Sequence, residues 1–347
     1  MRSPQQPAQI DANAAVSAAV ASTMRAIVQH TYGTADVLRL EQIAKPEIAD
    51  DEVLVQVHAA GMDRGTWHFM TGRPYLMRVM GFGFRAPKNP AAGIDLAGTV
   101  VAVGSGDSKL AVGDEVYGIG RGSFAEYSAA SEAKLARKPA YITFEQAAVV
   151  PVSALTALQA LTDVGRVSEG QRVLIIGASG GVGSYAVQLA KAFGAEVTGV
   201  CSTAKLDLVL SLGADHVLDY TRDDFADGEH TYDLIVDIAG NSTLSRLRRA
   251  LSPKGTLVIV GGESKGNLTG GIERQLRALL LTPFVGQRLT VCAAKERGSD
   301  LEERLTGLIE AGKLIPTIDR TYTLDQVPAA MRHLEAGQAR GKIAIRI

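Results

Sequence analysis

The sequence predicts an α/β protein in which a β-rich part is followed by a doubly wound parallel sheet. Its 347 residues are long for one hydrophobic core, which favours two domains. Up to about residue 139 the chain shows short apolar runs separated by turn residues. From residue 143 strand-like runs alternate with helix-like runs. These three observations define the fold class.

The β-rich part is expected to contain short strands and few helices. Its candidate strands are 25–29, 37–42, 52–61, 98–103, 115–118 and 123–128. Residues 62–90 form an irregular segment that is rich in aromatic side chains. A long loop of this kind forms a binding surface or a lid, and the alternative is a local hydrophobic cluster.

The second part begins with a predicted helix over 144–161, for which Thr143 supplies the N-cap. The strands that follow are expected at 173–176, 196–200, 216–218, 232–238, 255–260 and 289–293. The helices between them are expected at 181–193, 204–212, 244–251 and 300–310. Such alternation builds a parallel sheet with helices on both faces. The segments 315–318, 324–335 and 342–347 follow.

Residues 172–201 read RVLIIGASGGVGSYAVQLAKAFGAEVTGVC and predict a strand, a tight glycine turn, a helix and a second strand. Gly177 lets the chain turn off the strand, and Gly183 lets the helix approach the sheet. Gly180 and Gly181 leave the backbone open to a pyrophosphate at the helix N-terminus. We therefore expect a dinucleotide at this turn, and the alternative is a flexible turn without a ligand. The expected contacts are Ala178, Ser179, Gly180, Gly181 and Val182.

The end of the second strand indicates which dinucleotide binds. NAD-specific domains place an acidic residue there, where it binds the ribose 2′-hydroxyl. This chain has Ser202, Thr203 and Lys205 instead, which offer two hydroxyl donors and one positive charge. The sequence therefore predicts NADPH, and the alternative for Lys205 is a solvated helix residue.

Composition argues against several other functions. The formal net charge of −1 gives no indication of a nucleic-acid partner or an anionic membrane. No apolar stretch approaches the ~18 residues of a membrane span. Cys201 and Cys292 are too few for a disulfide framework or a four-cysteine zinc site, which agrees with a cytoplasmic location. Residues 1–23 are expected to be a disordered tail.

Motifs from Met24 to Ile347 resemble the medium-chain dehydrogenase/reductase (MDR) superfamily, in its zinc-independent, quinone oxidoreductase-like branch. They include AAGIDLAGTVVAVG, VGDEVYG, GASGGVG, YDLIVDIAG and ARGKIAI. The resemblance implies a GroES-like catalytic domain over 24–150 and 315–347, and a Rossmann domain over 151–314. It also implies a homodimer that is joined through the edge strand at 288–293.

The same resemblance bears on a metal ion. Zinc-containing relatives carry Cys, His and Cys where this chain has Asp63, Ile94 and a residue near Pro151. Because isoleucine has no ligand atom, we expect no metal, and the alternative is an oxygen-rich site of Asp63, His68 and Asp95. Without a Lewis acid, reduction of an electron-poor acceptor is favoured over oxidation of an alcohol.

Further cofactor residues follow from strand ends and from the resemblance. Residues at the ends of the fourth and fifth strands are expected beside the cofactor, namely Ala239, Gly240, Gly261 and Gly262. Thr156, Tyr220 and Lys342 match family positions near the nicotinamide, the adenosine phosphate and the cleft. The alternative for Lys342 is a surface charge on a terminal strand.

The functional hypothesis is an NADPH-dependent oxidoreductase that reduces quinones or α,β-unsaturated carbonyl compounds without zinc. Hydride transfer leaves a negatively charged oxygen, for which His68 and Tyr75 are the candidate donors. Trp67, Phe82 and Phe124 are expected to bind a small, conjugated, hydrophobic substrate. Two alternatives stay open. One is a nucleotide-binding protein with little catalysis that binds a partner or RNA, and the other is an NADP-dependent alcohol dehydrogenase.

Overall fold

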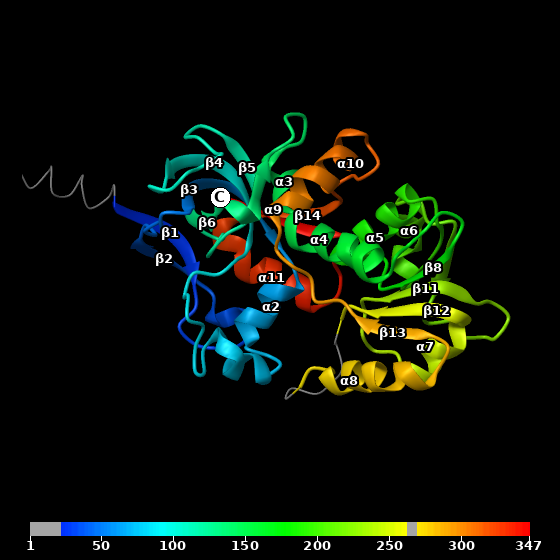
Figure 1. The fold of residues 1–347 in the computed structure, drawn as a ribbon. Coiled ribbons are helices and arrows are strands. Elements are labelled where there is room, and N and C mark those ends of the chain that lie inside the picture. Colours follow the sequence, from blue (N-terminus) through cyan, green and yellow to red (C-terminus); the bar gives the residue numbers. More distant parts are fainter. Residues whose placement is uncertain (1–21, 262–268) are drawn as a thin grey trace, which may run out of the picture.

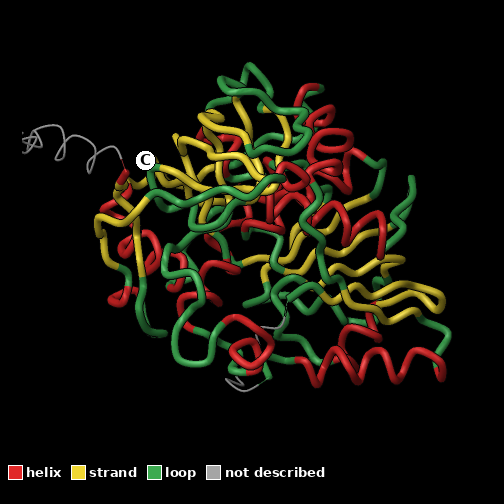
Figure 2. The backbone as a smooth tube through the Cα atoms, turned by 60° about the vertical axis from the view of Figure 1, so that its left-hand side comes forward, coloured by secondary structure: helices red, strands yellow, loops and turns green. Residues whose placement is uncertain are grey.

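The computed structural model describes residues 22–261 and 269–347, so the predicted tail lies, up to residue 21, outside the described residues. The expected α/β class is confirmed, because Figure 1 shows one body built on a mixed sheet and one built on a parallel sheet. Figure 2 shows the same two groups of strands from another side. Every helix in the described ranges is too short or too polar to traverse a bilayer.

The first sheet combines strands from both ends of the chain. The strands outside the parallel sheet are β1 (Thr23–Val28), β2 (Arg39–Ala44), β3 (Glu52–Met62), β4 (Asp95–Val103), β5 (Glu115–Ile119), β6 (Tyr127–Ser131), β7 (Leu135–Arg137), β14 (Ile318–Thr323) and β15 (Lys342–Arg346). The sheet order is β14-β15-β3-β4-β5-β7, and β6 also pairs with β3. The last strand of the chain, β15, thus lies directly beside β3, while β1 and β2 pair separately.

The second sheet consists of six parallel strands. They are β8 (Arg172–Ile176), β9 (Glu196–Cys201), β10 (His216–Asp219), β11 (Tyr232–Asp237), β12 (Leu251–Ile259) and β13 (Arg288–Val291). Their order is β10-β9-β8-β11-β12-β13. From β8 the chain adds β9 and β10 on one side, and it then crosses over to add β11, β12 and β13 on the other side. Open α/β sheets bind their ligands at such a switch point, which here lies between β8 and β11.

Helices cover both faces of this parallel sheet. They are α5 (Gly181–Ala192), α6 (Leu206–Ser211), α7 (Leu244–Ala250) and α8 (Ile272–Leu281). Val173 and Ile175 of β8 are buried in the same core as α5, whereas Leu174 and Ile176 are buried with α7 and α8. Figure 1 accordingly shows α5 and α6 above the strands and α7 and α8 below them. The prediction of a doubly wound sheet is confirmed.

The glycine turn has the geometry that the sequence predicts. Gly177 has φ of 90°, a left-handed backbone conformation that favours glycine. A Cβ atom on Gly183 would lie 2.1 Å from the carbonyl oxygen of Gly177, so only glycine lets α5 start this close to the strand. Gly180 is the N-cap, and α5 begins at Gly181. The first turn of α5 therefore offers N–H groups at the carboxyl edge of the sheet.

Two helix predictions need correction. Residues expected to be irregular form α2 (Arg64–Thr71), because Asp63 caps the helix by accepting a hydrogen bond from the N–H of Thr66 at 2.9 Å. The helix predicted over 144–161 is divided into α3 (Phe144–Ala148) and α4 (Pro151–Gln159). Proline lacks the N–H that a helix interior requires, so it starts a new helix here. Thr143 is the N-cap, as predicted.

Two strand predictions are displaced along the chain. The strand expected at 123–128 is β6, which begins at Tyr127, because Phe124 and Glu126 first bond to β1 outside any ladder. The strand expected at 37–42 is β2, which begins at Arg39, because residues 35–37 form a short 3₁₀ turn. In both cases the predicted strand starts before the hydrogen-bonded ladder does.

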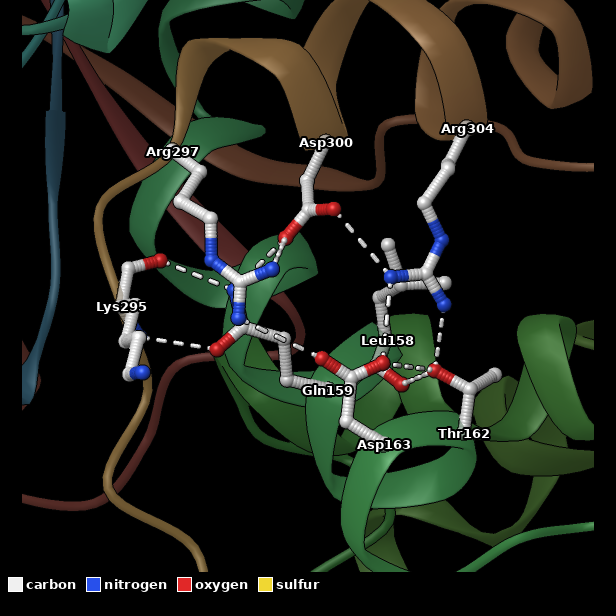
Figure 3. A network of polar contacts seen from close by, with 8 residues as sticks. All are labelled: Leu158, Gln159, Thr162, Asp163, Lys295, Arg297, Asp300 and Arg304. Atoms are coloured by element: carbon white, nitrogen blue, oxygen red, sulfur yellow. Dashed lines mark hydrogen bonds and ion pairs between the residues drawn. The ribbon is translucent and has the colours of Figure 1, made fainter.

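A polar network holds the chain where it returns from β13 toward the first sheet (Figure 3). The helices of this return are α9 (Gly298–Asp300), α10 (Thr306–Glu310) and α11 (Val327–Glu335). The Gln159 side chain donates to the carbonyl oxygen of Lys295 and accepts from its N–H, each at 2.8 Å. Arg304 donates to Asp163 at 3.1 Å and to Asp300 at 3.2 Å. The return segment is therefore fixed against the C-terminal end of α4.

Candidate cofactor and substrate site

The glycine turn presents an open backbone surface to a ligand. The nearest atom to a Cβ placed on Gly180 is 3.6 Å away, so the space before α5 is empty of side chains. Gly180, Gly181 and the half-buried Val182 form this surface. Ala178 is fully buried and Ser179 nearly so. The prediction that Ala178 contacts the cofactor is therefore corrected, because this residue lies beneath the turn and supports it.

The end of β9 carries Ser202, Thr203 and Lys205, two of which already have partners. The hydroxyl of Thr203 donates to Asp219 at the end of β10. The prediction of Thr203 as a phosphate donor is therefore wrong in this structure, because its hydroxyl proton is used. Lys205 Nζ donates to two backbone carbonyl oxygens that follow α11, at 2.8 and 2.7 Å. An ammonium has three protons, so Lys205 remains a candidate for the 2′-phosphate.

Asp219, at the end of β10, places a carboxylate beside the end of β9, which has no acidic residue of its own. It accepts hydrogen bonds from the N–H and the hydroxyl of Thr221 at 3.0 and 2.8 Å. The hydrogen bond from Thr203 is the main cause that lowers the pKa of Asp219, so this carboxylate is negatively charged at neutral pH. Tyr220 follows it and is 63% exposed, at the edge where the resemblance places the adenosine phosphate. A 2′-phosphate here would meet both Lys205 and a negative charge.

Arg274 on α8 joins the loops that follow β11 and β12. Its guanidinium forms an ion pair with the fully buried Asp237 at the end of β11. It also donates to the carbonyl oxygens of Ser242 at 3.0 Å and Gly261 at 2.9 Å. Asp237 in turn accepts from the N–H of Gly240 at 3.1 Å. The ion pair therefore fixes the backbone beside which the cofactor was predicted.

Ala239 and Gly240 are placed at this carboxyl edge, as expected for residues that follow β11. Gly262, which was also predicted to contact the cofactor, lies outside the described residues. Thr156 lies inside α4, where its hydroxyl donates to the carbonyl oxygen of Val152 at 2.7 Å. That hydroxyl can still accept a hydrogen bond from a ligand.

Lys342 is enclosed where five segments of the chain meet. The residue is only 1% exposed, so it is not a charge on a surface strand. Its Nζ lies 3.0 Å from Ser153 Oγ, 3.4 Å from Asp95 Oδ2 and 3.9 Å from Asp63 Oδ2. Its Cδ would be 3.0 Å from a Cβ on Gly181, so the stem lies against the glycine turn. The cluster of Asp63, Asp95, Ser153 and Lys342 thus links β15, α2, β4, α4 and α5.

Asp95 is the most strongly perturbed acid of this cluster. Its pKa is raised to about 8, mainly because the residue is completely buried; Lys342 opposes the rise, and the nearby Asp63 adds to it. Asp95 Oδ1 also accepts a hydrogen bond from the N–H of Val152 at 3.0 Å. One proton shared among two carboxylates and an ammonium leaves the buried cluster without net charge, which is the state that a low-dielectric interior favours.

The cluster does not fit a zinc ion. Zinc requires ligand atoms at about 2.0–2.3 Å, and no positive side chain among them. Here the ammonium of Lys342 lies within 4 Å of both carboxylates, at 3.4 and 3.9 Å, and would repel a metal cation. Ile94, at the position of the missing histidine, packs against the hydrophobic core. The oxygen-rich alternative is disfavoured for the same reason, because the ammonium already lies beside Asp63 and Asp95.

A cavity of about 310 Å³ is lined by Ile94 and by both apolar and charged residues, the charged ones being Lys88, Arg121, Lys134 and Glu296. Thr66, which caps onto Asp63, lines it, so the cavity and the Lys342 cluster share a wall. A cavity of this size suits a small ligand. Its apolar walls include Phe69, Met70, Phe82, Ile94 and Ile119.

The structure divides the aromatic residues that were predicted to line one cleft. Phe82 lines the cavity and packs on Phe69 with ring centroids 5.0 Å apart. Phe124 is fully buried in the core beside β1, so the prediction that it binds substrate is corrected. Trp67 faces α11, where its indole N–H donates to Glu335 at 2.8 Å. Tyr75 lines a separate surface hollow.

That surface hollow lies on the segment after α2. It has a volume of about 700 Å³ and is lined by Tyr75, Leu76, Arg78, Val79, Phe84, Arg85 and Thr269. The segment is held at its base, because Arg78 donates to the carbonyl oxygens of Gly72 at 2.9 Å and Thr71 at 3.0 Å. Tyr32 fixes its far end by donating to the carbonyl oxygen of Gly83 at 2.8 Å.

His68 lies on α2 in a defined orientation. Its Nδ1 is 2.7 Å from the carbonyl oxygen of Arg73. A carbonyl oxygen only accepts, so Nδ1 carries the hydrogen of the neutral ring. The other ring nitrogen, Nε2, is then an acceptor when the ring is neutral and a donor when the ring is protonated.

Sequence reasoning did not identify Ser153, Asp219 or Arg274 as residues of the site. Ser153 is one residue from the expected position of a zinc-binding cysteine, which was the available signal. Asp219 ends the strand next to β9, so the search for an acid needed both strands. Arg274 had no signal, since its partner Asp237 is 37 residues away in the chain.

Comparisons with known proteins agree with these features. Residues 49–140 match the family described as alcohol dehydrogenase GroES-like domain, and residues 212–345 match zinc-binding dehydrogenase. Over 96% of its length the chain is 35% identical to the 2-methylene-furan-3-one reductase of Solanum lycopersicum, of which it covers 82%. Over 98% of its length it is 35% identical to the chloroplastic NADPH-dependent alkenal/one oxidoreductase of Arabidopsis thaliana, of which it covers 84%.

A solved structure agrees as well. The quinone oxidoreductase from Coxiella burnetii matches with a TM-score of 0.80 at 27% identity, over 94% of this chain and 99% of that one. The mixed sheet, the parallel sheet and the glycine turn between them define the fold of a dinucleotide-dependent oxidoreductase. The chain belongs to the medium-chain dehydrogenase/reductase superfamily, in its zinc-independent, quinone oxidoreductase-like branch.

Proposed function

We propose that this protein reduces quinones or α,β-unsaturated carbonyl compounds with NADPH and without a metal ion. The NADPH-dependent oxidoreductase class agrees with the curated relatives, which include an NADPH-dependent alkenal/one oxidoreductase. The cavity lined by Ile94 supports the choice of substrate, because Ile94 offers no ligand atom at the position where zinc-containing relatives have histidine. An acceptor that is reduced here must already be electron-poor.

One set of residues would bind the cofactor, and another would hold the acceptor. NADPH, when bound, supplies the hydride. The N-terminus of α5 binds the pyrophosphate through the N–H groups at Gly180 and Gly181, and Lys205 binds the 2′-phosphate. Phe69 and Phe82 hold a flat acceptor by ring contacts and keep water from it.

The oxygen of the acceptor becomes negatively charged as it is reduced and needs a proton donor. His68 is the first candidate, because its Nδ1–H is already used by Arg73 and its Nε2 donates when the ring is protonated. Its neighbours Thr66, Phe69 and Met70 line the cavity but His68 does not, so the acceptor oxygen would have to lie at the rim on the side of α2. Tyr75 is the second candidate, although its ring lies under the guanidinium of Arg78 at 4.6 Å.

The test is NADPH consumption with a panel of quinones, enones and saturated alcohols. We expect turnover of the conjugated acceptors and no oxidation of alcohols by NADP⁺. His68→Ala should lower kcat by roughly 10²–10³, the scale of one such donor, and leave the Kd of NADPH unchanged. His68→Lys keeps a cationic donor and should restore part of the rate. Efficient alcohol oxidation without reduction of any acceptor would refute the proposal.

We also propose a homodimer that forms through β13. This strand is the edge of the parallel sheet, so its outer side is unpaired within one chain. Apolar side chains on and after α8 are exposed beside it, namely Leu276, Leu279, Leu280 and Phe284. A second copy would pair with the strand and cover these side chains. Light scattering at micromolar concentration tests this, and a monomer would argue against it.

Two further predictions are kept as proposals. The division into a catalytic domain over 24–150 and 315–347 and a nucleotide-binding domain over 151–314 is supported by the sheet in which β14 and β15 join β3. A cytoplasmic location is supported by the buried, free thiols of Cys201 and Cys292. Fluorescent-protein fusions of the full chain in its native cell would test the location.

A further inference from the structure

The cavity that Ile94 lines carries more positive than negative side chains. Its four charged residues are Lys88, Arg121, Lys134 and Glu296. Apolar side chains such as those of Phe69 and Phe82 form much of the remaining wall. We propose that the cavity takes conjugated acceptors that bear a carboxylate, and that Lys88 and Arg121 bind this carboxylate. This inference rests on the proposed reductase function and adds to it the charge of the substrate.

Ion pairs leave one of these positive charges unbalanced. Lys134 Nζ lies 2.6 Å from the carboxylate of Glu296, so these two lining residues neutralise each other. Arg121 pairs at 2.7 Å with Glu52, which does not line the cavity. Lys88 is exposed and has no ion-pair partner within residues 22–261 or 269–347. A ligand that brings its own negative charge would supply the missing partner.

Lys88 and Arg121 belong to two segments that touch each other. Lys88 lies in the loop that leads to β4, and Arg121 lies in the turn that follows β5. The N–H of Gly122 donates to the carbonyl oxygen of Gly93 at 3.2 Å. A Cβ atom on Gly122 would lie 2.5 Å from the Cβ of Ala91, so the two segments are in direct contact. The two positive residues therefore line neighbouring parts of the cavity wall.

The same wall offers N–H donors for a carboxylate. The Nη2 atom of Arg121 donates to Glu52, and the guanidinium has further N–H groups in its planar fork. The side chain of Asn89 accepts a hydrogen bond from the N–H of Ala91 at 3.1 Å through its amide oxygen. Its amide NH₂ group, which has no partner within the described ranges, can then donate to a ligand. A carboxylate binds charged donors of this kind more strongly than a neutral ester does, because both partners then carry charge.

The test uses 3-benzoylpropionate, which has one aromatic ring and one carboxylate, and its uncharged methyl ester. Each is titrated by calorimetry into the full chain with NADP⁺ present, so that affinity is measured without turnover. Two exposed cations should make the acid bind about 2–25-fold more tightly than the ester. Lys88→Gln should lower this acid-to-ester ratio of affinities by about 1.5–5-fold, and the double variant Lys88→Gln, Arg121→Gln should abolish the preference.

The matched control is Lys313→Gln, because Lys313 is also exposed but lines a separate hollow beside α5 and α6. It should leave the ratio unchanged. The inference is overturned if the acid binds no more tightly than the ester, if its preference survives the double variant, or if Lys313→Gln lowers the ratio equally.

The unsaturated acid 3-benzoylacrylate and its methyl ester separate this inference from the reaction, in which a hydride from NADPH and one proton saturate the C=C bond. NADPH consumption without a preference for the acid overturns the inference and leaves the proposed reaction intact. A preference for the acid that the double variant abolishes, without NADPH consumption, supports the carboxylate site and counts against the proposed reaction.

Discussion

Replacing Lys205 by alanine should change which dinucleotide the protein prefers. Lys205 follows the end of β9, and its ammonium lies within hydrogen-bond distance of two carbonyl oxygens that follow α11. Burial lowers the pKa of Lys205, so the charged form depends on partners that accept its protons. A 2′-phosphate is a stronger partner than a carbonyl, because it is itself charged.

The magnitude follows from the type of contact. A hydrogen bond to a charged group contributes about 1.5–3 kcal/mol, which corresponds to roughly a 10–150-fold change in affinity. Lys205→Ala should weaken NADPH by this factor and leave NADH nearly unchanged, since NADH has no 2′-phosphate. The carbonyl contacts of Lys205 are lost with either cofactor, so they cancel in the ratio of the two affinities.

Fluorescence titration with NADPH and NADH measures both affinities. Lys191→Ala is the matched control, because Lys191 also donates to a carbonyl oxygen, that of Ala195 at 3.1 Å, but pairs with Asp215 at the opposite edge of the sheet. It should leave the ratio unchanged. An equal loss of NADPH and NADH in Lys205→Ala would show that the residue acts only through the segment after α11, and the assignment to the phosphate would be wrong.

Three further substitutions test other parts of the site. Asp219→Asn removes a negative charge beside the proposed 2′-phosphate position and should tighten NADPH relative to NADH by at least about 1.5–5-fold, because this is the range for exposed charge pairs and Asp219 is only 3% exposed; a tightening of NADH relative to NADPH would contradict it. Burial raises the pKa of Asp95 to about 8, so the folded state holds a proton that the unfolded state loses, and stability should fall as pH rises from about 4 to about 8. Urea unfolding at several pH values should show a flatter profile for Asp95→Asn, and an unchanged slope would exclude Asp95 as the cause. Gly183→Ala should lower stability by about 1–3 kcal/mol in the same urea assay, because its Cβ would meet the carbonyl oxygen of Gly177 at 2.1 Å; unchanged stability would mean that the turn can relax.

Sequence patterns predicted those parts of the fold that depend on residues close together in the sequence. The glycine turn and the parallel strands follow from apolar runs and from positions that tolerate only glycine, and both kinds of signal are contained in a few residues. The break at Pro151 and the helix capped by Asp63 were missed, although each has a local cause. In these two places the apolar pattern outweighed the capping and proline signals.

The site was harder to predict because its contacts join distant parts of the chain. Lys342 bonds to Asp95, 247 residues earlier, and no periodicity connects the two. Thr203 donates to Asp219 on the adjacent strand, so a search limited to one strand found the donor and missed its acceptor. Phe124 is aromatic and close in sequence to the cavity wall, but sequence cannot distinguish a core ring from a cavity ring when both are apolar.

The segment that follows α2 offers a practical route to redesign. Its two ends are tied down by Arg78 and Tyr32, while Val79 and Phe84 between or beside these ties are 73% and 74% exposed. Side chains that are exposed to this degree contribute little to the core, so a library that varies them should retain folded members at high frequency. The side chains of Val79 and Phe84 can therefore be replaced without rebuilding the hydrophobic core.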